Sequence, residues 1–330
     1  MPFTALHHKA RRSLVYRAAW LALTCIAPAW SQGFPDKPIR LVVPYAPGGS
    51  ADIAARLIAD DWGKRLGQPV VVDNKAGASG NLGMDAVAKS RADGYTLSLN
   101  TVSQAINPSL FGRLPFDTLK DLKAVGTVAT SQHVLVVSNQ VPAKTVRELV
   151  ALAKAGPGKL SFGSAGTGST FHMAAELFKA ESNTFILHVP YRGGGPALID
   201  TISGQVDMSF PVLSAAQQHV AGGKLRALAV TGPKRSPILP EVPTMAEAGL
   251  PNYAFETWFV VSVPAGVVPD TLVKLNRTLN ETLNAPEVRT RLTREGFDAW
   301  PQTPGQSDAL IRSEYERWKK LVAQKGIKAD

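Results

Sequence analysis

The sequence predicts an α/β fold of two lobes, each with a mostly parallel sheet flanked by helices. From Lys37 onward, short apolar runs alternate with amphipathic helical patterns, which is typical of parallel sheets with crossover helices. This alternation occurs twice along the chain. The 330 residues are 45% hydrophobic and 19% charged, so the chain can bury one or two full cores and lacks the polar bias of disordered proteins.

The first lobe is expected to be doubly wound, because strands and helices alternate from its start. The predicted elements are a strand at 39–44, a helix at 51–66, a strand at 69–73, a helix at 81–89 and a strand at 95–99. In the first of these helices an apolar residue recurs every fourth position, which predicts a face that packs on the sheet: Ala54, Ile58, Trp62 and Leu66.

The second lobe is expected to repeat this plan. Its predicted strands are 159–162, 185–189, 206–210 and 227–230, and its predicted helices are 169–179, 196–203 and 215–221. The C-terminal third adds an apolar run at 258–263, a helix at 270–283 and a long amphipathic helix at 307–322.

Residues 1–31 have the layout of a secretory signal peptide. Basic residues without any acid precede an apolar stretch at 18–27, and small residues follow at Ala27, Ala29 and Ser31. The stretch is shorter than the about 20 residues that a membrane-spanning helix needs. Export to the periplasm is therefore expected. Both the general secretory route and a twin-arginine route through Arg11 and Arg12 remain open, as does cleavage after Ala29 or Ser31.

Composition excludes several classes of protein. The only cysteine, Cys25, lies inside the predicted signal peptide, so the mature chain is expected to have no thiol and no disulfide. The formal net charge of +10 falls to about +6 without the signal's Lys and Arg residues, and the remaining basic residues form no run of five or more. Nucleic-acid binding is not indicated.

The first candidate binding loop is Pro47-Gly48-Gly49-Ser50-Ala51-Asp52, between the first strand and its helix. Glycines let bare backbone approach a ligand, Ser50 is a suitable helix N-cap, and the first amides and the dipole of a helix favour a carboxylate. An ordinary capped turn is the alternative. Asp52 is interpreted as a structural acid or as the partner of a cationic ligand group.

A second loop of this design is Gly163-Ser164-Ala165-Gly166-Thr167-Gly168-Ser169-Thr170 in the other lobe. Two opposed helix starts are suited to one anion. The loop lacks the lysine of a phosphate-binding loop, and Phe171 occupies the third glycine position of the dinucleotide pattern. His172, in the first turn of the helix that follows, is either a ligand contact or a packed, capping histidine.

Further candidates lie in a third loop and at the end of a strand. Tyr191 could cover a ligand, and Arg192 could pair with a carboxylate, although a surface position is the alternative for this arginine. Asn100 and Thr101 end the third strand and offer neutral polar groups to the same region.

The motifs of common enzymes and metal sites are missing from the sequence. There is no Gly-x-Ser-x-Gly elbow, no His-Glu-x-x-His motif and no cysteine nucleophile, and the four histidines beyond the signal are His133, His172, His188 and His219. Neither catalysis nor a metal or other cofactor is expected.

Several segments resemble the Bug family, the substrate-binding proteins of tripartite tricarboxylate transporters. They are Phe34-Pro35-Asp36-Lys37-Pro38-Ile39-Arg40, Val43-Pro44-Tyr45-Ala46-Pro47-Gly48-Gly49, Val72-Asp73-Asn74-Lys75-Ala76-Gly77-Ala78-Ser79-Gly80-Asn81, Asp93-Gly94-Tyr95-Thr96-Leu97, His188-Val189-Pro190-Tyr191-Arg192-Gly193, 221–230 and 240–250. The resemblance runs in order from about residue 34 to the C-terminus.

The resemblance implies a two-lobed periplasmic binding protein of the Venus-flytrap, type II-like kind, with two crossovers near residues 133 and 254. Lobe 1 would then be 32–133 plus 254–330, and lobe 2 would be 134–253. Ligand carboxylates would contact Pro47 to Asp52, Asn100, Thr101, and Ala165, Gly166, Gly168 and Ser169. Where many relatives have an acidic or amide residue after the Val-Asp-Met strand, this chain has Phe210, which favours a less polar or aromatic acid.

The expected function is reversible capture of a small carboxylate (a di- or tricarboxylate, an amino acid or an aromatic acid) by a monomer. The closed form would dock on the membrane permease subunits of a tripartite tricarboxylate transporter. A second hypothesis is a receptor that docks on a sensor kinase. A third is an exported α/β hydrolase, which would need a serine or acid with an activated partner.

Overall fold

The computed structural model describes residues 33–325 and residue 327. The chain divides into two units, 1–36 and 37–330, and all the helices and strands described below belong to the second. The predicted signal peptide, with Cys25, lies outside the described residues. Within the described part, no helix is both long and apolar enough to cross a bilayer.

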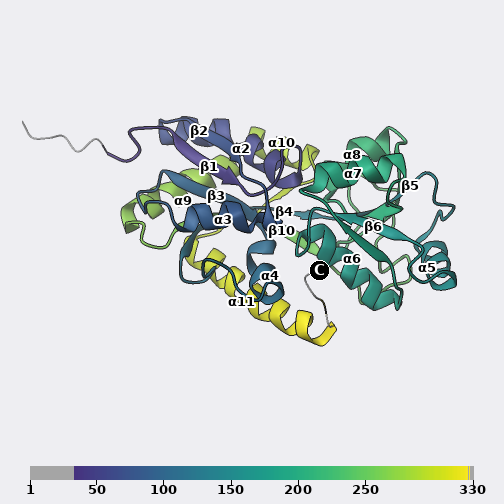
Figure 1. Ribbon diagram of the computed structural model, residues 1–330. Helices are drawn as coiled ribbons and strands as arrows, with labels where there is room; N and C mark the ends of the chain where they lie inside the picture. Colours follow the sequence, from purple (N-terminus) through teal and green to yellow (C-terminus); the bar gives the residue numbers. More distant parts are fainter. Residues whose placement is uncertain (1–32, 326, 328–330) are drawn as a thin grey trace, which may run out of the picture. The chain divides into compact units, whose positions relative to one another are not determined.

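The first sheet has six strands in the order β11-β4-β10-β3-β1-β2. Figure 1 labels β1, β2, β3, β4 and β10. Its strands are β1 (Ile39–Val43), β2 (Val70–Asn74), β3 (Thr96–Thr101), β4 (Leu122–Gln132), β10 (Glu256–Pro264) and β11 (Asp298–Ala299). The helices in the same stretches of chain are α2 (Ser50–Leu66), α3 (Asn81–Ala88), α4 (Ser103–Leu110), α9 (Pro269–Asn284), α10 (Pro286–Arg294) and α11 (Pro304–Lys325), with a short 3₁₀ turn at Ala78–Gly80.

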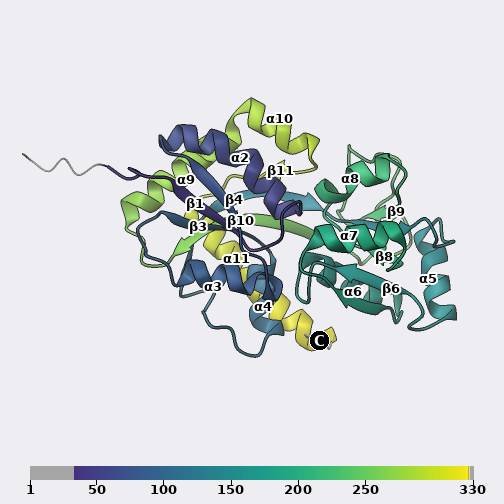
Figure 2. The same cartoon turned by 45° about the horizontal axis from the view of Figure 1, so that its top comes forward.

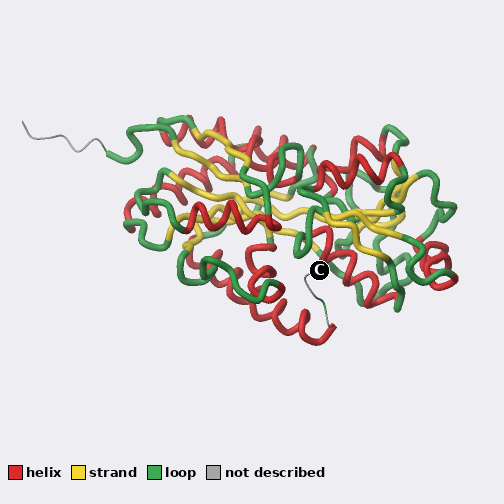
Figure 3. The backbone as a smooth tube through the Cα atoms, viewed as in Figure 1, coloured by secondary structure: helices red, strands yellow, loops and turns green. Residues whose placement is uncertain are grey.

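The second sheet has five strands in the order β7-β6-β8-β5-β9. Its strands are β5 (Val134–Ser138), β6 (Ser161–Ser164), β7 (Leu187–Pro190), β8 (Met208–Ser209) and β9 (Leu225–Val230). Its helices are α5 (Val146–Ala155), α6 (Thr170–Ser182), α7 (Gly194–Ser203) and α8 (Leu213–Ala221). Figure 3 shows helices on both sides of the strands, as expected for an α/β fold.

The predicted α/β class and the two sheets are confirmed, but the sheets are mixed and not mostly parallel. β1 is parallel to β2 and β3, whereas β10 is antiparallel to both β3 and β4. In the second sheet, β6 is parallel to β7 and β8, whereas β5 is antiparallel to β8 and β9. Every antiparallel pair includes β4, β5 or β10, the strands that carry the chain between the sheets. Of these three, β4 and β5 were not predicted.

The chain passes between the sheets twice, and the two passages are tied together. His133 alone separates β4 from β5, and the return runs from Val230 to β10. The backbone N–H of His133 donates to Thr231 Oγ1 (2.8 Å), and the N–H of Thr231 donates to the His133 carbonyl (2.9 Å). Both passages therefore meet at one buried pair of residues, His133 and Thr231.

The apolar stripe predicted for the first helix explains how α2 is held. Ala54, Ile58, Trp62 and Leu66 are all buried. Trp62 is fully buried, and its indole Nε1 donates to Thr278 Oγ1 of α9 at 3.0 Å. α2 packs against both α9 and α10 (Figure 2). The first candidate loop thus leads into a helix whose inner face is buried against the rest of the fold.

Candidate ligand-binding site

The loop before α2 is organised by Asp52. This carboxylate is 4% exposed, accepts a hydrogen bond from the Gly48 N–H (3.0 Å) and forms an ion pair with Arg56 (3.0 Å). The N-cap is Gly49, without a side-chain cap, so the prediction that Ser50 caps the helix is wrong. The helix already includes Ser50, and Asp52 supplies the acceptor that binds a loop amide. These bonds agree with the structural interpretation of Asp52.

The Asp52–Arg56 pair is expected to stabilise the fold. Burial alone would raise the pKa of Asp52, but hydrogen bonds from Arg56 and Gly48 outweigh burial and hold the pKa below its usual range. Asp52→Asn is expected to lower the free energy of unfolding at pH 7 by about 1 to 3 kcal/mol, because a charged hydrogen bond is lost. Urea titration measures this loss, which should shrink as the pH falls through the depressed pKa.

A matched variant on the same helix is Asp60→Asn. Asp60 pairs with Lys64 at 2.6 Å, but its side chain is 77% exposed. Such a pair contributes about 0.5 kcal/mol or less. Equal losses for the two variants would contradict the structural role of Asp52.

The end of β3 supports the loop through Tyr45. The Tyr45 hydroxyl donates to Asn100 Oδ1 (3.2 Å) and lies 3.3 Å from Thr101 Oγ1. All three side chains are buried. Burial raises the pKa of Tyr45, against the opposing effect of hydrogen bonds with Ser103 and Thr101, so the phenol is neutral at pH 7. Asn100 therefore orients Tyr45, and Thr101 lines the cavity described below.

The second loop is closed by its own side chains. Gly166 and Gly168 have φ of +112° and +81°, a backbone conformation that favours glycine. Ser169 is the N-cap of α6 and accepts from the His172 N–H at 3.3 Å. His172 is 2% exposed, and its Nδ1 accepts from the Gly168 N–H at 3.1 Å. The structure thus places His172 as a packed, capping histidine.

The third loop separates its two predicted residues. The Tyr191 hydroxyl donates to Asp200 Oδ2 (2.7 Å), and burial together with Asp200 raises the pKa of Tyr191 to about 12. Arg192 is exposed, and its guanidinium has no hydrogen bond or ion pair within the described part of the chain. The helix that follows, α7, begins at Gly194 without a side-chain cap.

The three loops meet around one small cavity of about 20 Å³. It is lined by Tyr45, Gly49, Ser50, Ala51, Thr101, Ala165, Ser169, Thr170, Phe171 and Gly194. These residues include the first turns of α2, α6 and α7. The two sides touch directly, because Ser103 Oγ donates to the Gly168 carbonyl at 3.2 Å and a Cβ on Gly193 would lie 3.0 Å from the Ala46 Cβ.

Five of the thirteen predicted site residues line this cavity: Gly49, Ser50, Thr101, Ala165 and Ser169. The other eight are not among the residues that line it: Pro47, Gly48, Asp52, Asn100, Gly166, Gly168, Tyr191 and Arg192. Ala51, Thr170 and Gly194 lie within the predicted loops but were not singled out, and Tyr45 and Phe171 were not predicted to line the site. Their positions beside Gly-rich turns were the only signal available.

The cavity is lined by hydroxyls, backbone and apolar groups, and none of its ten lining residues carries a charged side chain. An anion there would be held by backbone amides at the positive ends of three helices and by neutral hydroxyls. Among the residues that the structure describes, no group of three or more His, Cys, Asp or Glu side chains is arranged for a metal ion.

A family model described as the tripartite tricarboxylate transporter family receptor matches residues 54–327. The chain belongs to this family. BugT of Bordetella pertussis (strain Tohama I) is 40% identical over 304 residues, which are 92% of this chain and 93% of BugT. The receptor family is one of solute-binding proteins, so this protein is not an enzyme, and the hydrolase hypothesis is wrong.

Solved structures of periplasmic proteins share the fold of this receptor. A periplasmic transporter is 38% identical with a TM-score of 0.87, covering 90% of this chain and all of the other. R. palustris Rpa4515 with adipate is 34% identical with a TM-score of 0.87, covering 89% and 99%. MatC from Rhodopseudomonas palustris with bound malate is 32% identical with a TM-score of 0.84, covering 88% and 100%. The predicted periplasmic binding protein class is confirmed.

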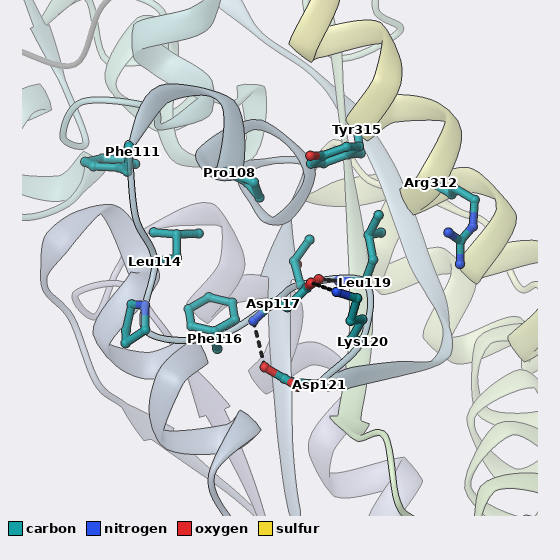
Figure 4. Close-up of a pocket in the computed structure, with 13 residues that line it drawn as sticks. Pro108, Phe111, Leu114, Phe116, Asp117, Leu119, Lys120, Asp121, Arg312 and Tyr315 are labelled. Atoms are coloured by element: carbon teal, nitrogen blue, oxygen red, sulfur yellow. Dashed lines mark hydrogen bonds and ion pairs between the residues drawn. The ribbon is translucent and has the colours of Figure 1, made fainter.

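A larger pocket lies elsewhere on this receptor, between the loop before β4 and α11 (Figure 4). Its volume is about 660 Å³, and Phe111, Phe116 and Tyr315 are among its lining residues. No first turn of a helix contributes to its lining, and its Lys120 is already paired with Asp117 at 3.1 Å. We therefore take the small cavity, where three helix starts converge, as the candidate site.

The residue that departs from the family pattern does not line the cavity. Phe210 is fully buried and packs against Phe178 (5.5 Å between ring centroids) and Tyr253 (6.4 Å). An aromatic residue does line the cavity, but it is Phe171. An influence of Phe210 on the ligand would therefore have to pass through the core.

Proposed function

We propose that this receptor captures a small carboxylate between the first turns of α2, α6 and α7 and delivers it to the membrane subunits of a tripartite tricarboxylate transporter. The observation that carries the proposal is the convergence of the first turns of three helices on one cavity whose lining has no charged side chain. The ligands named for two relatives, adipate and malate, are small carboxylates. Export through residues 1–31 to the periplasm is part of the proposal.

The size of the cavity implies that capture requires movement. A volume of about 20 Å³ has room for about one water molecule. A carboxylate with a carbon chain needs several times more, so the loops of the two sheets must separate to admit it. We propose lobes of 32–133 plus 254–330 and of 134–253, which would turn about the tied pair His133 and Thr231.

The available contacts are sufficient for tight binding without a metal. Hydrogen bonds to a charged group contribute about 1.5 to 3 kcal/mol each. Four or five of them from loop amides and hydroxyls approach the about 8 kcal/mol of a micromolar complex, after ordering costs. Asp52 and His172 already hold the first and the second loop by hydrogen bonds to their amides. The cost of ordering these loops on binding is therefore low.

The test is a thermal-shift titration of the mature protein, refolded to remove any bound ligand. Adipate and malate are the first probes, followed by tricarboxylates, amino acids and aromatic acids. Ligand at 100 times its Kd adds about 2.7 kcal/mol of stability, a rise in Tm of about 5 °C. The matched control is 1,6-hexanediol, which has the length of adipate but no charge.

Two outcomes decide between the possibilities. A concentration-dependent rise with one acid, absent with the diol, would support anion capture. No rise with any carboxylate, or an equal rise with the diol, would contradict it.

A further inference from the structure

Two histidines and a phenylalanine form a stack beside the second loop. Phe162 of β6 and His188 of β7 have ring centroids 4.8 Å apart, and the rings of His188 and His172 are 4.2 Å apart. The planes of the two imidazoles differ by 27°. The stack joins three elements of the second sheet next to the loop that carries Gly166 and Gly168.

Both imidazoles are connected to amides of that loop. His172 Nδ1 accepts directly from the Gly168 N–H at 3.1 Å. His188 Nε2 lies 2.6 Å from Ser164 Oγ, and Ser164 Oγ accepts from the Gly166 N–H at 3.1 Å. Each histidine therefore sets the direction of one amide of the second loop.

The contact with Gly168 requires a neutral His172. Nδ1 accepts a hydrogen bond only while it carries no proton. A proton on Nδ1 would place two N–H groups against each other, so the loop amide would lose its partner. Imidazole is the side chain whose charge ordinarily changes between about pH 5 and 8. A second charge on His188, stacked alongside, would oppose the first.

The charged groups around the stack act on His172 in opposite directions. Glu176 Oε1 lies 3.7 Å from His172 Nε2 and 2.6 Å from Lys179 Nζ, so it is shared between them. Lys179 Nζ also lies 5.7 Å from the centre of the Phe162 ring. From the third loop, Tyr191 faces Gly163, and its hydroxyl is bonded to Asp200. A protonated His172 would find a carboxylate on one side and lose its loop contact on the other.

We propose that His172 and His188 are positioning residues that orient the loop amides, so that protonation of His172 weakens ligand capture as the pH falls. The proposal rests on the proposed function for its ligand, but the stack and its bonds to the loop exist independently of it. A receptor outside the cytoplasm would then hold its ligand more tightly in neutral than in acidic surroundings.

The first test measures the Kd of the carboxylate found by thermal shift between pH 8.0 and 6.0, where that acid stays ionised. For the unmodified protein the Kd should rise about three- to tenfold, the factor that corresponds to about one hydrogen bond. His172→Asn places an uncharged acceptor near the position of Nδ1, so its Kd should change less than twofold with pH. His172→Leu removes the acceptor, so its Kd should be high at both pH values.

The second test needs no ligand. With ¹⁵N-glycine labelling, the amide signals of Gly166 and Gly168 are followed over the same pH range. The Gly168 signal should shift in the unmodified protein and stay in place in His172→Asn, whereas the Gly166 signal reports on the contact through Ser164 with His188. His219→Asn is the matched control, because His219 lies on α8 outside the lining of the cavity, and it should keep the pH response.

The outcomes separate this proposal from the proposed function. If no carboxylate binds but the Gly168 signal titrates with His172, the positioning role stands and the proposed ligand class fails. If a carboxylate binds with the same pH dependence in His172→Asn as in the unmodified protein, or if the Gly168 signal moves equally in both, the positioning role is refuted. A melting curve for each variant at both pH values ensures that only folded protein is compared.

Discussion

Gly168→Ala is expected to weaken carboxylate binding by about 30-fold or more while leaving the protein folded. Gly168 has φ of +81°, and a Cβ there would lie 2.7 Å from Asn107 Oδ1 and 3.0 Å from Leu110 Cδ1 on the opposite side of the site. Asn107 cannot easily move, because its Nδ2 donates to the Ser79 carbonyl (3.0 Å) and to Asn81 Oδ1 (2.9 Å). The added methyl group therefore keeps the two sides apart.

The substitution has two costs, of which only one affects binding. An alanine at positive φ costs about 1 kcal/mol of stability in the free and the bound protein alike, whereas the blocked approach costs about 2 kcal/mol or more on binding, which corresponds to about 30-fold in Kd. Isothermal titration with the carboxylate measures the Kd, and the melting temperature reports on folding. Because the methyl group blocks closure and not the open form, most of the second cost should appear only in binding.

Gly67→Ala is the matched control for backbone strain. Gly67 ends α2 with φ of +78°, and a Cβ there would meet nothing within 4 Å. This variant should lose about 1 kcal/mol of stability and no affinity. Adding Asn107→Ala to Gly168→Ala should recover part of the lost affinity. Binding by Gly168→Ala at the level of the unmodified protein would show that the two sides need not meet as they do here.

Acidification is expected to destabilise the protein by about 3 kcal/mol through His133 alone. His133 is fully buried, and burial, opposed by the hydrogen bond with the Phe210 carbonyl, lowers its pKa from 6.5 to about 4. The unfolded chain then binds the proton more readily than the folded one. The contribution is fully present above about pH 6.5 and is lost as the pH falls to about 4.

The measurement is the free energy of unfolding in urea at several pH values from 7.5 to 4. His133→Asn keeps an N–H that can donate to the Phe210 carbonyl, which lies 2.7 Å from Nδ1 in the structure, but it cannot be protonated. This variant should be less stable at pH 7.5 because it leaves a cavity, yet its stability should fall about 3 kcal/mol less on acidification. His219→Asn should retain the full slope. If the free energy of unfolding of His133→Asn fell with pH as steeply as that of the unmodified protein, His133 would not be the source of the acid sensitivity.

The effects expected for Gly168→Ala and for protonation of His133 both concern the proposed movement of the two lobes. Gly168 lies where the two sides touch, and His133 lies where the chain passes from one sheet to the other. The proposed turning of the lobes needs a dry, well-packed crossing, which a neutral His133 between Phe171 (6.0 Å) and Phe255 (5.0 Å) provides. Strong acid should therefore loosen the crossing as well as the fold.

Local patterns in the amino-acid sequence were sufficient for the fold class and for most of the elements. The four-residue spacing of Ala54, Ile58, Trp62 and Leu66 predicted α2 and its buried face, because helix geometry places these side chains on one side. The position of Gly-rich turns after strands predicted three candidate loops, because parallel strands end at one edge of a sheet. The family motifs then added the binding-protein class, which no local pattern could specify.

Tertiary structure alone decided which of these residues meet. The antiparallel strands β4, β5 and β10 are buried along most of their length, so their apolar runs show no alternation that would mark direction or partner. Phe171 joins the site although it reads as a core residue, and Arg192 remains on the surface although its chemistry suits an anion. The contacts of Ser103 with Gly168 and of His133 with Thr231 join residues 65 and 98 positions apart. Such pairs form only when the whole chain has folded, since periodicity reports on neighbours within a few residues and not on distant partners.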